Sequence, residues 1–589
     1  MAEAKRTWSV PTSPRSPHKL ADELNLLSRF EGQEWSRETQ RSFAEELGQS
    51  DFFEGSIYQR EPDFSARDRI NRSPKTFGFV RFDHGNRIEI TDAGRQLISN
   101  VRPTELFLRQ LIKWQYPSPK HSGASYAGFK IKPFLEVLRL AHELDGLTKK
   151  EIAIFCIPFI DYNNYETIKS EIVDFRERAA ALRGTEKKRF LTQFHLDRYR
   201  SVYYSEIESG NFRIREQGNT EASIDSFIKT KARNSVDYAD AAIRYFRATG
   251  LFTISSRTFR LKILDTKQEI VESILENTDR EPALFINNEG AFLDIMCNPS
   301  LPVLPQDDET ILKSEISSLL GKIAERGHSI VGVEEFSVEN IDRLTVDQLK
   351  DKQESLEALL KNSSEIAQIQ ELQSYDLFDD ISDVFKKISD RKDTDIPDKP
   401  LFFEWNTWRA LNMLDDGEIK GNLSMDTEGK PLHAATGGMP DITCYYRDFV
   451  LVVEVTLTSG STQFTAEGES VPRHLGDVTR SLRAQGDNRP VFGMFVALNL
   501  NNATIAHFYS LRRTEISFYG GRAKIIPIDI ATFQKMLESA KNVGGVQSRQ
   551  LYSFLQWVNE RADTASDESV WYSDVSARAR EWVSVSSGS

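Results

Sequence analysis

The spacing of apolar residues divides the chain into three parts. Residues 1–302 combine helical spacing with short alternating stretches, residues 303–398 are helical and acidic, and residues 399–589 alternate helices with strands. This pattern predicts a multidomain protein with a mainly helical N-terminal region, a helical linker and a C-terminal α/β domain.

Two hairpins are expected in the N-terminal region. Residues 77–90 predict two short strands around a Gly/Asn turn, and residues 251–264 alternate in the same way after a helix at residues 239–248. Arg257 and Arg260 fall in the second hairpin. A helix followed by a basic hairpin, seen twice, favours a pair of winged-helix-like modules.

Residues 148–178 are interpreted as a helix-turn-helix. Residues 148–151 form a capping box, and a second helix is expected to begin near Asn164, with Lys169 and Arg176 on its more polar side. The second helix of such a motif can enter a major groove. An ordinary helical hairpin gives the same pattern, and that alternative stays open.

A basic segment precedes the first hairpin. It holds Arg67, Arg69, Arg72 and Lys75, and we expect a loop there that is suited to phosphate or groove contacts. A merely solvated loop has the same composition.

The charge is unevenly distributed along the chain. The net charge is −13, but residues 1–290 carry 45 Lys and Arg against 42 Asp and Glu, whereas residues 291–589 carry 30 against 46. A basic N-terminal region on an acidic protein suits a local anion-binding surface, although solvated faces distributed by chance give the same totals.

Length and cysteine usage set further bounds. A chain of 589 residues is too long for one core and predicts three or four domains. No apolar run approaches the ~20 residues that span a bilayer, and the first ten residues lack a signal segment, so we expect a cytoplasmic location. Cys156, Cys297 and Cys444 lie far apart, which fits a reducing compartment and excludes a paired zinc spacing.

Residues 449–457 predict a central strand that carries a carboxylate. The segment is apolar on both faces except at Glu454, and a lone buried carboxylate costs several kcal/mol unless a partner or metal compensates it. Asp441 follows Pro440 in a turn thirteen residues earlier. Two carboxylates that converge from adjacent strands form a site for a hard cation such as Mg²⁺.

Further polar residues surround this pair in the sequence. Glu404 aligns with apolar residues of the helix at 401–414, and Glu467, Glu469, Arg473 and His474 follow in a segment expected to run from loop to helix. Such a set can bind one or two cations, and His474 can orient or deprotonate an attacking water. His474 could equally cap a helix or bind a phosphate, and Glu469 could be only a solvated neighbour.

The Asp441 and Glu454 arrangement resembles the PD-(D/E)-x-K nucleases, which hydrolyse DNA phosphodiesters. Thr456 stands where that superfamily usually has Lys. The surrounding residues resemble, more specifically, the AlwI-type restriction endonucleases, which are Type IIS enzymes related to site-specific nicking endonucleases. The C-terminal motifs are FEWNTW (403–408), HAA (433–435), PD (440–441), EVT (454–456), TQF (462–464) and RH (473–474), and the N-terminal ones are SPRSP (13–17), FEG (30–32), RDR (67–69), KTFGFV (75–80), KWQYPS (113–118), RYFR (244–247) and NPSLP (298–302).

The resemblance implies a DNA-recognition region at 1–302, a helical linker at 303–398 and a cleavage domain at 399–589. It implies Mg²⁺-dependent cleavage at a fixed distance from a short asymmetric site, with Thr456 as the expected residue in this family. Asp441, Glu454 and Glu404 would bind metal, Glu467 would be a further acidic member, and His433 and His474 would support catalysis. We expect His433 to lie in a Gly-rich loop.

The expected partners are double-stranded DNA, a second cleavage subunit or a transient self-dimer, and a cognate methyltransferase. Two other classes stay open. The first is a DNA-binding protein with a degenerate nuclease domain, which Thr456 favours and the intact acidic residues do not. The second is a protein-interaction scaffold, which explains neither the buried Glu454 nor the basic hairpins.

Overall fold

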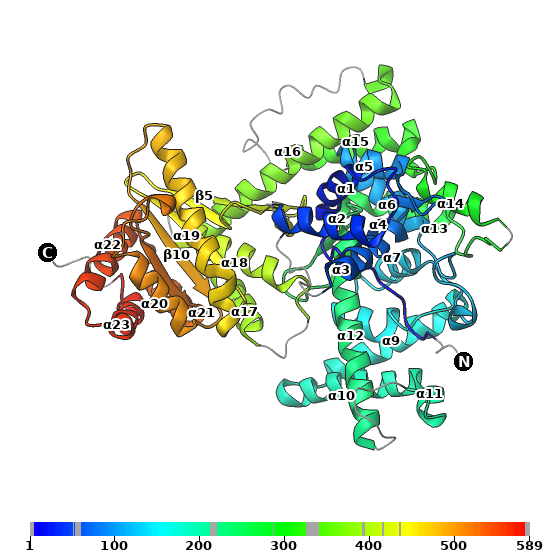
Figure 1. The fold of residues 1–589 in the computed structure, drawn as a ribbon, viewed down its shortest axis with the longest axis horizontal. Helices are drawn as coiled ribbons and strands as arrows, with labels where there is room; N and C mark the ends of the chain where they lie inside the picture. The colour runs from blue at the N-terminus through cyan, green and yellow to red at the C-terminus, as the bar shows by residue number, and fades with distance from the viewer. Residues whose placement is uncertain are drawn as a thin grey trace. The chain divides into compact units, whose positions relative to one another are not determined.

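The structure is a computed structural model of the 589-residue chain. It describes residues 5–50, 52–53, 61–212, 221–286, 288–325, 341–390, 395–414, 417–434 and 437–583. The chain divides into two compact units, which we describe separately: unit 1 comprises residues 1–327 and 332–359, and unit 2 comprises residues 328–331 and 360–589 (Figure 1).

Unit 1 is mainly helical. Its helices are α1 (Leu20–Ser28), α2 (Arg37–Gln49), α3 (Pro62–Asn71), α4 (Ser73–Thr76), α5 (Asp92–Ile98), α6 (Pro103–Lys113), α7 (Pro133–Glu143), α8 (Lys149–Glu151), α9 (Tyr165–Ala180), α10 (Gly184–Val202), α11 (Tyr204–Glu208), α12 (Glu221–Arg247), α13 (Gln268–Asn277), α14 (Glu289–Cys297), α15 (Glu309–Glu325) and the first half of α16 (Val346–Gln373). Aromatic residues such as Phe77, Trp114 and Tyr245 form part of its core.

Both hairpins predicted for unit 1 are confirmed. β1 (Val80–Phe82) pairs with β2 (Ile88–Ile90), and β3 (Phe252–Ile254) pairs with β4 (Leu261–Ile263), each antiparallel. Gly78 enters the first hairpin with φ +71°, and a Cβ there would lie 2.5 Å from the carbonyl oxygen of Met296. Glycine is therefore required on both conformational and steric grounds. The winged-helix assignment itself stays a prediction.

The helix-turn-helix segment is partly as predicted. Thr148 and Glu151 form the capping box, and α9 follows Asn164 as its N-cap. The apolar run after the box is a π-helix (Ile152–Cys156). The predicted basic loop at residues 67–75 is wrong: α3 and α4 occupy this segment, because Pro62 and Pro74 stand in the first turns of two successive helices.

Unit 2 contains a five-stranded mixed sheet. Its strand order is β11-β10-β9-β8-β5, with β9 (Val450–Thr456), β10 (Val491–Ala497) and β11 (Ile525–Asp529) parallel, and with β8 (Ile442–Tyr445) and β5 (Glu418–Gly421) antiparallel to their neighbours. A separate hairpin joins β6 (Leu423–Met425) and β7 (Pro431–Ala434).

Helices flank this sheet (Figure 1). Those in contact with its strands are α18 (Lys399–Leu414), α19 (Ser461–Ala484), α20 (Asn502–Leu511) and α21 (Ile530–Asn542). Unit 2 also contains the second half of α16, α17 (Phe378–Ser389), α22 (Ser548–Thr564) and α23 (Glu568–Arg580). Val450 and Val452 pack in one apolar cluster with Val471 and Leu475 of α19. Because side chains alternate along a strand, Glu454 and Thr456 also lie on the α19 side of β9.

The described part of residues 303–398 is mainly helical, in α15, α16 and α17. They belong partly to unit 1 and partly to unit 2. The boundaries predicted at 302 and 398 stay predictions. Among the described helices, none is long and apolar enough to cross a membrane.

Candidate active site

The two predicted carboxylates meet at the paired strands β8 and β9. Asp441 directly precedes β8, and the register that pairs Ile442 with Val453 places Asp441 across from Glu454. The Asp441 carboxylate accepts a hydrogen bond from the backbone N–H of Val455, with 2.7 Å between N and Oδ2. This bond holds the Asp441 side chain against the end of β9.

Glu454 is a buried carboxylate with a histidine partner. It is 7% exposed, and its Oε1 lies 2.8 Å from Nδ1 of His474. Burial, followed by the negative charge of Glu467, raises the pKa of Glu454 well above its ordinary value, while a hydrogen bond with the Asp441 backbone and the charge of Arg473 act in the opposite direction. A cation at this carboxylate would offset the cost of ionising it.

His474 presents its other nitrogen without a protein partner. Its Nε2 is buried and makes no hydrogen bond within the described part of the chain. Burial and the neighbouring Arg473 lower the pKa of His474, so the neutral imidazole is favoured. If Nδ1 donates to the Glu454 carboxylate, Nε2 carries the lone pair and can accept a proton.

α19 brings Glu467 and His474 to the same strand. Glu467 is half-buried and accepts a hydrogen bond from the Thr456 side chain, and burial raises the pKa of its carboxyl. The predicted loop-to-helix transition is wrong, because α19 is continuous from Ser461 to Ala484. Glu469 is exposed and pairs with Arg473 at 3.0 Å, as its solvated alternative predicts.

Pro472 lies inside α19 and interrupts its backbone hydrogen bonding. Proline has no N–H, so the carbonyl of Gly468 loses its helical donor. His507 of α20 replaces it: its Nε2 lies 2.8 Å from the Gly468 oxygen. This substitute bond lies between Glu467 and His474 in the sequence and supports the helix that carries both.

Gln463 is a buried residue at the start of α19 to which the sequence assigned no role. It is fully buried, and its amide nitrogen donates to the carbonyls of Thr458 and Asn499, at 2.9 Å each. Its amide oxygen accepts from the backbone of Asn501. Gln463 therefore ties α19 to the segments that follow β9 and β10. The TQF motif contained Gln463, but its hydrogen bonds join segments that are distant in the sequence, and no local sequence pattern predicts them.

The structure places Glu404 on α18 and His433 on β7, two elements that contact each other. Glu404 is half-buried on α18, which contacts β5, β7 and β9. His433 lies in β7 opposite Ser424, with Nδ1 2.9 Å from the carbonyl oxygen of Ala434. The expected Gly-rich loop placement of His433 is therefore wrong. Ala435, in the same motif, lies outside the described residues.

Three side chains of unit 1 that are predicted to bind DNA make ion pairs within the protein. Arg176 donates to both oxygens of buried Glu151, at 2.7 and 3.0 Å, and to two backbone carbonyls. Lys169 pairs with Glu143 at 2.6 Å, and Arg69 pairs with buried Glu23 at 2.7 Å. The roles of these three residues in binding DNA stay predictions.

The other predicted cations have fewer constraints. Arg72 bonds to Asp68 at 2.7 Å and to Thr12, and Arg67 lies over the ring of Phe64. Arg257 is exposed in the turn between β3 and β4, Arg260 is half-buried beside it, and Lys75 is exposed on α4. Their roles in binding DNA stay predictions.

The residues fit a magnesium ion by their chemistry. Asp441, Glu454 and Glu467 supply hard oxygen donors, and Glu454 has a raised pKa that a cation would lower. Among the described residues, no group of three or more His, Cys, Asp or Glu side chains forms a complete metal cluster. Mg²⁺ commonly uses one or two carboxylates together with waters and substrate phosphates, so an incomplete protein cage agrees with it.

Comparisons with known proteins identify one family. The sequence model described as AlwI restriction endonuclease matches residues 75–536. A search of curated proteins finds no match. Among solved structures, the crystal structure of the small subunit (R.BspD6I2) of the heterodimeric restriction endonuclease R.BspD6I is similar at 23% sequence identity, over 35% of this chain and 96% of that chain, with a TM-score of 0.27.

Proposed function

The chain belongs to the AlwI restriction endonuclease family, a class of site-specific deoxyribonucleases, and on that premise we propose that it is a Type IIS restriction or nicking endonuclease. It binds a short asymmetric duplex sequence through residues 1–302 and hydrolyses phosphodiester bonds at a fixed distance outside it. The observation that carries the proposal is the buried Glu454, which lies opposite Asp441 and bonds to His474.

Asp441 and Glu454 would hold Mg²⁺ in this proposal, with Glu404 as a predicted further ligand. The ion, when bound, neutralises phosphate charge and lowers the pKa of water. The Val455 N–H orients the Asp441 carboxylate, and His474 orients that of Glu454. His433 is kept as a supporting group on β7.

His474 acts as the general base in this proposal. Its Nδ1 is engaged by Glu454, which leaves Nε2 to accept a proton from the attacking water. Glu467 and Thr456 hold each other by a hydrogen bond. Thr456 occupies the position where Lys stands in the wider superfamily, so β9 supplies no cation there, and a bound Mg²⁺ would supply the positive charge.

The alternative is a DNA-binding protein with a degenerate nuclease domain. Thr456 favours it, because no cation stands at that position. The conjunction of Asp441, Glu454, Glu467 and His474 favours an enzyme, since a degenerate site gains nothing from an acid with a strongly raised pKa.

One active site cuts one strand, so double-strand cleavage needs a second site. We propose a separate cleavage subunit or a transient self-dimer as its source, and a methyltransferase that protects the host sequence.

The test is cleavage of supercoiled, site-rich plasmid DNA in Mg²⁺, with EDTA as control and with cut positions mapped by run-off sequencing. Discrete nicked or linear products whose ends lie at a constant distance from one shared sequence support the proposal. Binding to DNA without any Mg²⁺-dependent product would establish the degenerate alternative.

A further inference from the structure

A basic cavity in unit 1 has no role in the site described above. It has a volume of about 290 Å³ and lies among α4, β1, α14 and the segment that follows α6. The lining residues that matter here are Lys75, Thr76, Phe82, Lys120, His121 and Glu289. Two of the six are lysines from segments far apart in the sequence.

The two lysines lack carboxylate partners. Within the described parts of the chain, neither Lys75 nor Lys120 makes an ion pair. Lys75 lies over the ring of Phe82, with Nζ 5.1 Å from the ring centre, and Lys120 donates to the Thr76 hydroxyl at 3.2 Å. Both side chains are exposed, so a ligand can reach them.

Neighbouring cations increase the positive potential at the cavity. Partial burial of its ammonium group, with repulsion from Lys75 and Arg72, lowers the pKa of Lys120 to about 8. Burial also lowers the pKa of Lys75, although Glu289 acts in the opposite direction. Burial, together with the positive charges of Lys120 and Lys5, lowers the pKa of His121 to about 4, so the His121 ring is neutral. Cations that repel one another are stabilised by an anion between them.

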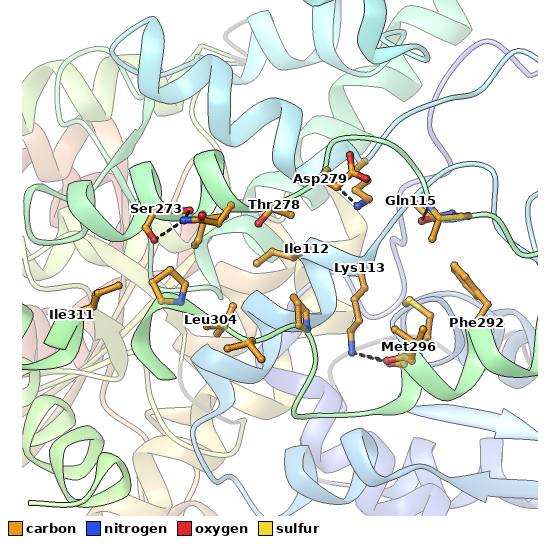
Figure 2. A pocket seen from close by; sticks show the side chains of 18 residues that line it. Ile112, Lys113, Gln115, Ser273, Thr278, Asp279, Phe292, Met296, Leu304 and Ile311 are labelled. Atoms are coloured by element: carbon orange, nitrogen blue, oxygen red, sulfur yellow. Dashed lines mark hydrogen bonds between the residues drawn. The ribbon is translucent and has the colours of Figure 1, made fainter. Parts of the chain in front are cut away.

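A larger neighbouring cavity provides a contrast. It has a volume of about 520 Å³, and its two lysines are Lys113 and Lys132 (Figure 2). Lys113 donates to three backbone carbonyls, including that of Met296 at 3.2 Å, and Lys132 donates to the carbonyl of Asp279 at 2.6 Å. Lys113, which also lines the smaller cavity, and Lys132 already have carbonyl acceptors, whereas Lys75 has only an aromatic ring and Lys120 only a hydroxyl.

We propose that the cavity bearing Lys75 and Lys120 binds one phosphodiester group of the DNA held by unit 1. The inference rests on the proposed function, which supplies the DNA. An ammonium pair is suited to a phosphate because each contributes charge and up to three donors. The Thr76 hydroxyl stands beside Lys120 as a further donor, and Glu289 at the wall disfavours a second anion.

The test compares the K75A/K120A double variant with K229A, which removes an exposed lysine of α12 elsewhere in unit 1. Fluorescence anisotropy measures binding to labelled duplex DNA in EDTA, from 50 to 300 mM salt. We expect the double variant to lose about 10-fold or more in affinity, and the slope of log K against log salt to fall by about 1. K229A should match the wild type, and a K75R/K120R variant should retain binding.

A second measurement separates DNA phosphate from free phosphate. Inorganic phosphate should raise the thermal unfolding temperature of the wild type more than that of K75A/K120A. If the double variant loses this response but binds DNA with the affinity and salt slope of K229A, the site serves a free anion and the inference is overturned. If the wild type binds no DNA at all, the proposed function fails first, and this inference fails with it.

Discussion

Replacing Glu454 with Gln removes the charge at the centre of the site and keeps the shape. Burial and the neighbouring Glu467 raise the pKa of the Glu454 carboxyl well above its ordinary 4.5. A Gln side chain fills the same space, and its amide can still meet Nδ1 of His474, which lies 2.8 Å from Oε1 in the wild type. The E454Q substitution therefore removes the titrating carboxyl group and leaves the packing of the site unchanged.

The raised pKa sets the sign of the pH effect. The folded protein holds this proton more tightly than the unfolded chain does, so the metal-free wild type loses stability as pH rises from 4.5 to the folded pKa. Each pH unit in that window costs up to about 1.4 kcal/mol, a cost that E454Q does not carry. From pH 5 to pH 7 the variant should gain up to about 2.7 kcal/mol relative to the wild type.

Thermal unfolding in EDTA across this pH range measures the difference. For a unit of this size, each kcal/mol shifts the unfolding temperature by roughly 2–4 °C, so the variant should gain stability at pH 7 relative to pH 5, by at most about 10 °C. In Mg²⁺, plasmid cleavage should fall about 1000-fold or more, because a metal ligand contributes several kcal/mol to the transition state.

E469Q is the matched control. Glu469 is an exposed carboxylate on α19 that pairs only at the surface with Arg473, so its removal should change neither cleavage nor the pH dependence. A wild-type cleavage rate in E454Q, or a stability difference that does not grow between pH 5 and pH 7, would refute the role given to Glu454.

Three further substitutions test the surroundings of the site and the recognition unit. H474Q should slow cleavage about 100-fold or more at pH 7.5 with DNA affinity unchanged, because the proton acceptor is lost. Single-turnover rates measure the cleavage and fluorescence anisotropy measures the affinity. An unchanged cleavage rate would remove His474 from the mechanism. H507F leaves the Gly468 carbonyl without its hydrogen-bond donor, so we expect a loss of about 1 kcal/mol of stability in urea unfolding. Cleavage should be slower while DNA binding stays intact. Full cleavage activity would contradict a role of His507 in positioning α19. R176M leaves buried Glu151 without its partner and should destabilise the protein by about 3 kcal/mol in urea unfolding. If the ion pair is its main role, the salt slope of DNA binding stays the same, whereas a shallower slope would support the predicted DNA contact of Arg176.

Much of unit 2 is predictable from local pattern. The strand that carries Glu454 is predictable because an apolar run with one carboxylate is rare, and the turn at Asp441 follows from the proline before it. The continuity of α19 is not predictable in this way. Pro472 signals a break, and the donor that replaces its missing N–H comes from His507, on a different helix.

The cations of unit 1 show a second limit of sequence reasoning. Lys169 and Arg176 occupy helix positions typical of DNA contacts, but their partners, Glu143 and Glu151, stand on other elements. Spacing along one helix does not reveal an acid supplied by another. Lys75 and Lys120 show the converse, since only the fold brings them to one cavity.

The most direct test of the central claim is to measure binding and cutting together in D441N. Asp441 lies across from Glu454 at one end of the β8–β9 pair, and exposed Asp448 lies in the turn at the other end, so D448N is the matched control. We predict that D441N binds plasmid DNA as the wild type does and yields neither nicked nor linear product in Mg²⁺, whereas D448N cuts normally. Cleavage by D441N at the wild-type rate would contradict the assignment of this site.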